Sequence, residues 1–198
     1  MKNLRTISKN STRSRILEST LKIIITKGIV DTSTKSIADS CNVAHGTLFA
    51  HFENRENLIG QVLKNELLQI AKRIYQLDIP NASLEDILSE YLNLIIEKEG
   101  LYVIINKEFP FVGTDIKREI ITTESNIKNL VLRKIKKGIR DKSYKAISPT
   151  MTVSFFFGTL NYYLSRKEYF VENGSVIEQK KDEIITTFLS LLKHNHGQ

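Results

Sequence analysis

The stretch from Thr32 to Arg55 constrains the fold of this chain most. It reads TSTKSIADSCNVAHGTLFAHFENR, and we interpret it as two short helices joined by a tight turn. The first helix is expected to open at Thr32 or Ser33, because either hydroxyl can accept a hydrogen bond from the unpaired amides of a first turn. Its apolar residues recur at helical spacing and form one narrow stripe: Ile37, Ala38 and Cys41.

The turn and the second helix follow directly. Asn42 tolerates the left-handed conformation that a sharp helix–helix turn requires, and Val43 is expected to plug the turn from beneath. The second helix is predicted from Ala44 to about His51, with Leu48 facing inward. Two short helices joined in this way form a helix-turn-helix, whose second helix enters the DNA major groove.

The polar residues around this stretch are of the types that contact DNA. Cationic side chains bind phosphates, hydroxyls bind phosphates or base edges, and Gly46 permits close approach of the backbone. The preceding helix is predicted from about Ser11 to Lys27, with Gly28 ending it. Arg13 lies in its first turn, where a cation opposes the helix dipole. A phosphate contact explains that placement, and an ordinary surface arginine is the alternative. The predicted DNA-binding residues are Arg13, Ser33, Lys35, Ser36, Ala44, His45, Gly46, Thr47, Phe49, His51 and Arg55.

From Arg13 to Val62 the chain resembles the DNA-binding domain of the TetR transcriptional regulators. The resemblance runs without gaps over about 50 residues. The matching residues are Arg13, Ile16, Leu17, Gly28, Thr32, Ser33, Ile37, Ala38, Val43, Gly46, Thr47, Leu48, Phe49, His51, Phe52, Arg55, Glu56 and Leu58. Four positions depart from the family pattern, where Gly, Ser, Lys and Tyr are usual: Asn42, Ala44, His45 and Phe49, the last of which keeps the aromatic ring but lacks the hydroxyl.

Charge is concentrated on the same part of the chain. The net charge of the 198 residues is +7. Residues 1–55 hold nine Lys and Arg against four Asp and Glu, a net +5, which leaves +2 for the other 143 residues. A positive N-terminal region favours a polyanionic partner. A second basic run, between Arg133 and Lys145, is read as a solvated helix end that complements the helix dipole, with a second nucleic-acid surface as the alternative.

The remaining sequence predicts an all-α protein of about nine helices. We expect a DNA-binding domain over residues 1–55, a connecting helix over 56–78 and a helical domain over 79–198. Residues 1–10 read as a basic arm or a solvated tail. Gly100 is expected to end the helix that precedes it. Three helix starts carry local capping signals: Ser83 with Asp86, Ser148 with Pro149, and Ser175 with Glu178.

The helix over residues 148–165 is apolar on all sides, so it requires cover on all sides. Gly158 lets a second helix come close. We therefore expect this helix and the last one to pair with their copies in a two-fold homodimer.

Five aromatic residues are candidates for lining a ligand cavity, with plain core as the alternative for each: Tyr91, Tyr102, Phe109, Phe156 and Tyr162. The acids Glu97, Glu99 and Glu108 are read as exposed surface, with a polar pocket wall as the alternative.

No catalytic set, phosphate-binding loop or metal motif is found in the sequence, so an enzyme is disfavoured and neither cofactor nor metal is expected. Cys41 reads as a small buried residue rather than a redox switch. The first residues lack an apolar signal core, which predicts a cytoplasmic protein without a membrane partner. The resemblance implies a bacterial repressor that binds double-stranded operator DNA and is released by a small-molecule effector. An architectural DNA binder, constitutive or controlled by a protein partner, is the alternative.

Overall fold

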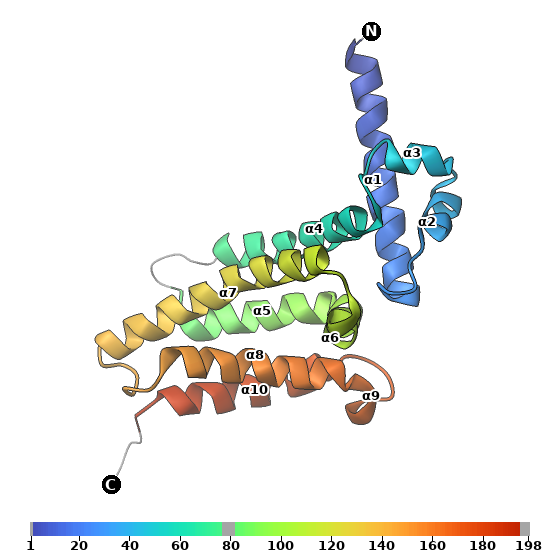
Figure 1. Cartoon of the computed structure of the whole chain (residues 1–198). Coiled ribbons are helices and arrows are strands. Elements are labelled where there is room, and N and C mark those ends of the chain that lie inside the picture. The colour runs from blue at the N-terminus through green and yellow to red at the C-terminus, as the bar shows by residue number, and fades with distance from the viewer. Residues whose placement is uncertain (1, 77–81, 195–198) are drawn as a thin grey trace. The chain divides into compact units, whose positions relative to one another are not determined.

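The computed structural model describes residues 2–76 and 82–194, and its regular secondary structure there consists of helices alone. Figure 1 shows the arrangement of the elements. In chain order they are α1 (Lys2–Lys27), α2 (Thr34–Cys41), α3 (His45–Phe49), α4 (Arg55–Gln76), α5 (Leu84–Glu97), α6 (Glu99–Glu108), the short 3-10 helix η1 (Phe109–Phe111), α7 (Thr114–Arg140), α8 (Pro149–Ser165), α9 (Lys167–Phe170) and α10 (Val176–Leu192).

The predicted all-α class, with an N-terminal helix-turn-helix, is confirmed.

The chain divides into two compact units. The first comprises residues 1–68 and 107–122, and the second comprises residues 69–106 and 123–198. The helices α4, α6 and α7 therefore contribute to both units. The border predicted at residue 78 lies outside the described residues.

The first unit is built on α1, against which α2 packs while α3 follows at a turn (Figure 1). The core between them is apolar and fully buried, with Ile16 and Ile24 from α1, Ile37 from α2 and Leu48 from α3. The prediction of an arm over residues 1–10 is wrong, because α1 already begins at Lys2. Residues 2–10 contain neither Gly nor Pro, so nothing interrupts a helix that extends back from residue 11.

In the second unit, α5, α8 and α10 lie side by side (Figure 1). Their facing residues form an aromatic and aliphatic core, in which Phe156 and Phe188 have ring centroids 5.0 Å apart. The predicted N-caps are present: Ser83 accepts from the amide of Asp86 and Ser148 accepts from that of Met151. Within the described residues, none of the helices combines the length and apolar character needed to span a bilayer.

One local expectation in this unit fails, and one short helix is unexpected. Gly100 does not end a helix: α5 ends at Glu97, and Gly100 lies inside α6. A glycine ends a helix when it adopts the left-handed conformation, and the described glycines with positive φ are Gly28 and Gly174. The four-residue helix α9 was not predicted, because its sequence KEYF is too short to show a helical period.

Candidate nucleic-acid interface

The helix-turn-helix of α2 and α3 is the predicted DNA reader. Its first helix, α2, is held by local capping at both ends. At its start Ser33 accepts from the amide of Ser36, and the Ser36 hydroxyl in turn accepts from the amide of Ser33. At its end Asn42 adopts the left-handed conformation, with φ 51° and ψ 50°. Both features match the sequence expectations. They use Ser33 and Ser36, two predicted DNA-contacting residues, to shape the helix start, although both remain solvent-accessible.

The second helix, α3, presents one face to solvent and one to the core. It spans five residues, shorter than predicted, with Ala44 as a cap that makes no side-chain hydrogen bond. Leu48 is fully buried and anchors the helix, whereas Ala44, His45, Gly46 and Phe49 are exposed. The His45 ring lies edge-on to Phe49, with centroids 4.9 Å apart, and its Nε2 is 3.0 Å from the Thr34 hydroxyl. The exposed face therefore offers an imidazole, a bare backbone and an aromatic ring to a groove.

Gly46 has a distinctive environment. A Cβ added at this position would meet no atom within 4 Å, apart from its chain neighbours and its own helix. The fold of this chain thus does not require a glycine here. A glycine without an internal reason is consistent with the close approach of an external backbone.

Lys35 is exposed on α2, while Thr47 and the turn residue His51 are half-buried.

The two predicted phosphate-binding arginines are engaged inside the unit. Arg55 Nε donates to the carbonyl oxygen of Thr32 at 2.7 Å, and its Nη2 donates to those of Ile29 and Val30. Its remaining donor Nη1 pairs with Glu56 at 3.0 Å.

Arg13 is held in a similar way. Its guanidinium lies over the Phe52 ring, 4.9 Å from the centroid, and donates to the side-chain oxygen of Gln61. Both arginines thus have an internal function that the sequence alone did not suggest, and Lys35 is the predicted cation on α2 that stands out to solvent.

The interpretation of Glu108, the last residue of α6, as exposed surface is wrong. Its Oε2 accepts from the backbone amides of Ile29 at 2.7 Å and Val30 at 2.8 Å. Gly28 has φ 89°, and a Cβ there would collide with the Glu108 carboxylate. The predicted helix-ending glycine therefore also makes room for an acid that lies 80 residues away along the chain.

Three of the five candidate ligand residues come together in the second unit. Tyr91, Tyr102 and Phe156 are buried, and the rings of Tyr91 and Phe156 have centroids 6.4 Å apart. Burial raises the pKa of both tyrosines, with a further upward contribution from the Glu124 charge. Glu124 is paired with Lys128 at 3.0 Å, and that ammonium lies over the Phe157 ring. The arrangement places a polar network against an aromatic core.

The other two candidates lie elsewhere. Phe109 belongs to η1 in the first unit, where the Lys117 ammonium is 5.8 Å from its ring centroid. Tyr162 is about half exposed on α8, with the Arg166 guanidinium over its ring at 5.0 Å. Phe109 and Tyr162 are therefore not part of the buried cluster formed by Tyr91, Tyr102 and Phe156.

The predicted exposure of Glu99 is also wrong, since its carboxylate is buried at the start of α10. It accepts from the amides of Val176 and Ile177 and from the Ser175 hydroxyl, and it pairs with Lys167 at 2.8 Å. Burial by itself raises the pKa of Glu99, but these hydrogen bonds outweigh it and leave the pKa below its usual value. Glu97 is exposed and pairs with Arg73.

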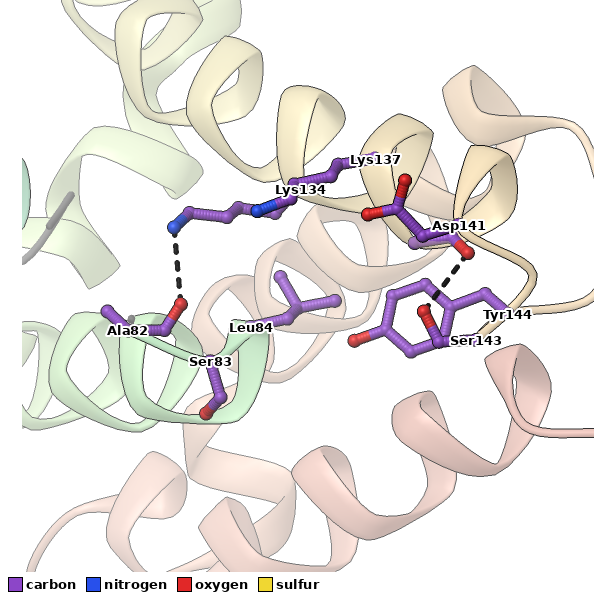
Figure 2. A pocket seen from close by; sticks show the side chains of 9 residues that line it. Ala82, Ser83, Leu84, Lys134, Lys137, Asp141, Ser143 and Tyr144 are labelled. Atoms are coloured by element: carbon purple, nitrogen blue, oxygen red, sulfur yellow. Dashed lines mark hydrogen bonds between the residues drawn. The ribbon is translucent and has the colours of Figure 1, made fainter. Parts of the chain in front are cut away.

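Each unit has a cavity among its described residues. One of about 260 Å³ in the first unit is lined mainly by acids and amides of α4 and α7. The other, of about 160 Å³, lies between the start of α5 and the end of α7 (Figure 2), where Lys134 donates to the carbonyl oxygen of Ala82. Neither is lined by a predicted ligand residue. No group of three potential metal ligands occurs among the described residues.

A capped helix, a left-handed turn and a short second helix with an exposed face define a helix-turn-helix protein. Residues 16–62 match the family described as bacterial regulatory proteins, tetR family, and residues 78–165 match the one described as tetracyclin repressor-like, C-terminal domain. The chain belongs to the TetR family of transcriptional regulators.

Individual relatives agree with this assignment. The chain is 26% identical over 161 residues to an uncharacterized HTH-type transcriptional regulator, YvkB, from Bacillus subtilis, covering 78% of this chain and 82% of that protein. Its fold is similar to that of the regulator FadR from Bacillus subtilis, solved in complex with stearoyl-CoA (TM-score 0.77, 16% identity, 90% of this chain and 98% of that one). It is also similar to the ketosteroid regulator KstR2 of Mycobacterium tuberculosis (TM-score 0.70, 15% identity, 92% and 97%).

Proposed function

We propose that this protein is a dimeric repressor that binds operator DNA through α3 and leaves it when a small molecule binds the second unit. The observation that carries the DNA-binding part is the exposed face of α3, where Gly46 stands in open space beside His45 and Phe49. Direct contacts with base edges in a major groove are expected from this face, and Lys35 is expected to bind a phosphate.

The proposed dimer rests on an exposed stripe along α8. Met151, Phe155 and Tyr162 are each about half exposed, at spacings that place them on one side of the helix with Gly158 between them. Large apolar side chains on one helix face indicate an interface, and nothing lies within 4 Å of a Cβ added at Gly158. A two-fold dimer then places two readers on half-sites roughly 34–36 Å apart or a multiple of that distance.

The proposed effector is a small organic molecule with an extended apolar part. Support comes from the aromatic cluster of Tyr91, Tyr102, Phe156 and Phe157, beside which the Glu124–Lys128 pair provides charge. The FadR structure that shares this fold contains stearoyl-CoA, so a long-chain acyl thioester is the first probe to try. The effector acts only if it binds the DNA-bound and released states unequally.

The experiment begins with selection of duplexes from a random pool by the purified protein. A two-fold symmetric consensus is expected, and Thr47→Ala is expected to change one position of it, whereas an unchanged consensus would contradict a specifying role for Thr47. Stearoyl-CoA is then titrated against the selected duplex, with free coenzyme A as the control. A protein that selects no duplex at low salt contradicts the proposal. DNA binding that no tested effector releases would favour the constitutive or partner-controlled alternative.

A further inference from the structure

The connection between α1 and α2, residues 28–32, is held by hydrogen bonds from side chains to its backbone. The peptide group between Ile29 and Val30 donates its N–H to Glu108 at 2.8 Å, and its carbonyl oxygen accepts from Arg55 at 2.5 Å. The N–H and C=O of a trans peptide point in opposite directions, so the carboxylate and the guanidinium hold this peptide from two sides. Glu108 additionally accepts the amide of Ile29.

This connection leads directly into α2, the first helix of the DNA reader. The carbonyl oxygen of Thr32 accepts from Arg55, and Ser33, the next residue, caps α2. Any shift of residues 28–32 therefore moves the first turn of α2, and with it Lys35. A carboxylate that accepts two backbone amides makes charge-assisted bonds, which are stronger and more directional than bonds between neutral groups.

We propose that Glu108 is a positioning residue for DNA recognition, which fixes the start of α2 without touching DNA. This inference rests on the proposed DNA-binding function. It also explains Gly28: with φ 89° the position favours glycine, and a side chain there would occupy the place of the Glu108 carboxylate.

The direction in which DNA affinity changes distinguishes a positioning role of Glu108 from an effect of its charge. A carboxylate in a unit that binds a polyanion weakens binding through its charge, so removing it without moving anything else tightens binding or leaves it unchanged. A positioning role predicts the opposite. Glu108→Ala and Glu108→Gln remove the same charge, but the amide oxygen of Gln can still accept the two backbone N–H groups. The difference between these two variants therefore reports the acceptor and not the charge.

The experiment measures the affinity of the full-length protein for a selected duplex at several salt concentrations. Glu108→Ala is expected to bind about tenfold more weakly than the wild type, with Glu108→Gln between the two and the salt dependence unchanged because no phosphate contact is lost. Glu53→Gln, an exposed acid of the same unit, is the charge control and is expected to bind equally or more tightly.

Amide hydrogen exchange provides a readout that does not depend on DNA. The amides of Ile29 and Val30 are expected to exchange faster in Glu108→Ala, with partial protection restored in Glu108→Gln, while the amide of Leu58 in α4 stays protected. Unchanged DNA affinity in Glu108→Ala overturns the inference. If that variant does not fold, Glu108→Gln carries the test, and binding equal to that of Glu53→Gln overturns it. A wild type that binds no duplex overturns the proposed function, and the exchange rates then separately decide whether Glu108 holds the connection.

Discussion

The guanidinium of Arg55 lies against the backbone of Thr32, with its Nε 2.7 Å from the carbonyl oxygen of that residue. Arg55 opens α4, and Thr32 closes the connection that precedes α2. The contact therefore joins the helix that follows the reader to the loop that precedes it. Thr32 is itself fully buried, and its hydroxyl donates to the carbonyl oxygen of Gly28 at 2.5 Å.

This relationship predicts that Arg55→Ala lowers the stability of the fold. The substitution leaves the carbonyl oxygens of Ile29 and Thr32 without their charged donor, so the free energy of unfolding is expected to fall by roughly 2–3 kcal/mol. Urea unfolding followed by circular dichroism measures it. Lys35→Ala removes the same charge from an exposed site and is expected to leave unfolding unchanged. Equal stability of the two variants would mean that Arg55 is not needed by the fold.

The features that the sequence predicted well are local. Ser33, Asn42, Ser83 and Ser148 act on backbone groups within five residues, so the short spacing alone reveals their function. The apolar stripe of α2 is predicted for the same reason, because it repeats within one element. The same reasoning made the exposed face of α3 predictable, since Leu48 is the buried residue of its short pattern.

The charged residues whose functions were misjudged have distant partners. Glu108 binds amides 78 and 79 positions away, and Glu99 binds amides 77 and 78 positions away. Arg13 reaches Gln61, 48 positions along the chain. A single sequence contains no distance information at such separations, so an acid or arginine that caps a remote backbone looks like an ordinary surface charge. Gly28 was the one local signal, since it marks a place where a neighbour comes close.

Lys35→Ala is expected to weaken binding to all duplexes alike. An exposed ammonium on α2 that contacts a phosphate releases counterions, so each lost contact makes the negative slope of log affinity against log salt less steep by about 0.9. Filter binding at several salt concentrations measures that slope. The matched control is Lys72→Ala, which removes an exposed lysine of the second unit and is expected to keep the wild-type slope. A slope that Lys35→Ala does not alter would argue against a phosphate contact.

Gly46→Ala is expected to separate folding from DNA binding. The added methyl group meets no atom within 4 Å beyond its chain neighbours and its own helix, and alanine is favoured over glycine in a helix by up to about 1 kcal/mol. The variant should therefore unfold at the same or a higher urea concentration, yet bind DNA more weakly because the methyl group faces the groove. Gly100→Ala, also in open space within α6, serves as the control and should keep full affinity. Undiminished affinity in Gly46→Ala would remove Gly46 from the interface.

Phe155→Glu is expected to dissociate the proposed dimer. The side chain is 58% exposed in one chain, but a partner helix at Gly158 would cover it, and burying an unpaired carboxylate costs several kcal/mol. The dimer dissociation constant should rise by roughly a hundredfold or more, as measured by sedimentation equilibrium. Phe111→Glu alters another exposed phenylalanine, in the first unit, and should leave the dimer dissociation constant unchanged. A dimer that tolerates glutamate at position 155 must use another surface.

Glu99→Gln is expected to lower stability in a pH-dependent way. At neutral pH the ionised carboxylate binds Lys167 and the amides at the start of α10, so the variant should lose roughly 2–3 kcal/mol of unfolding free energy. The pKa of Glu99 in the folded protein lies below its unfolded value of about 4.3. As the pH falls the unfolded chain therefore takes up the proton first, and stability decreases. The difference between wild type and variant should be constant from about pH 8 to pH 5 and should shrink below about pH 4.3. Urea unfolding across this range measures it, and a difference that shrinks toward high pH instead would mean that the buried carboxylate is not the stabilising species.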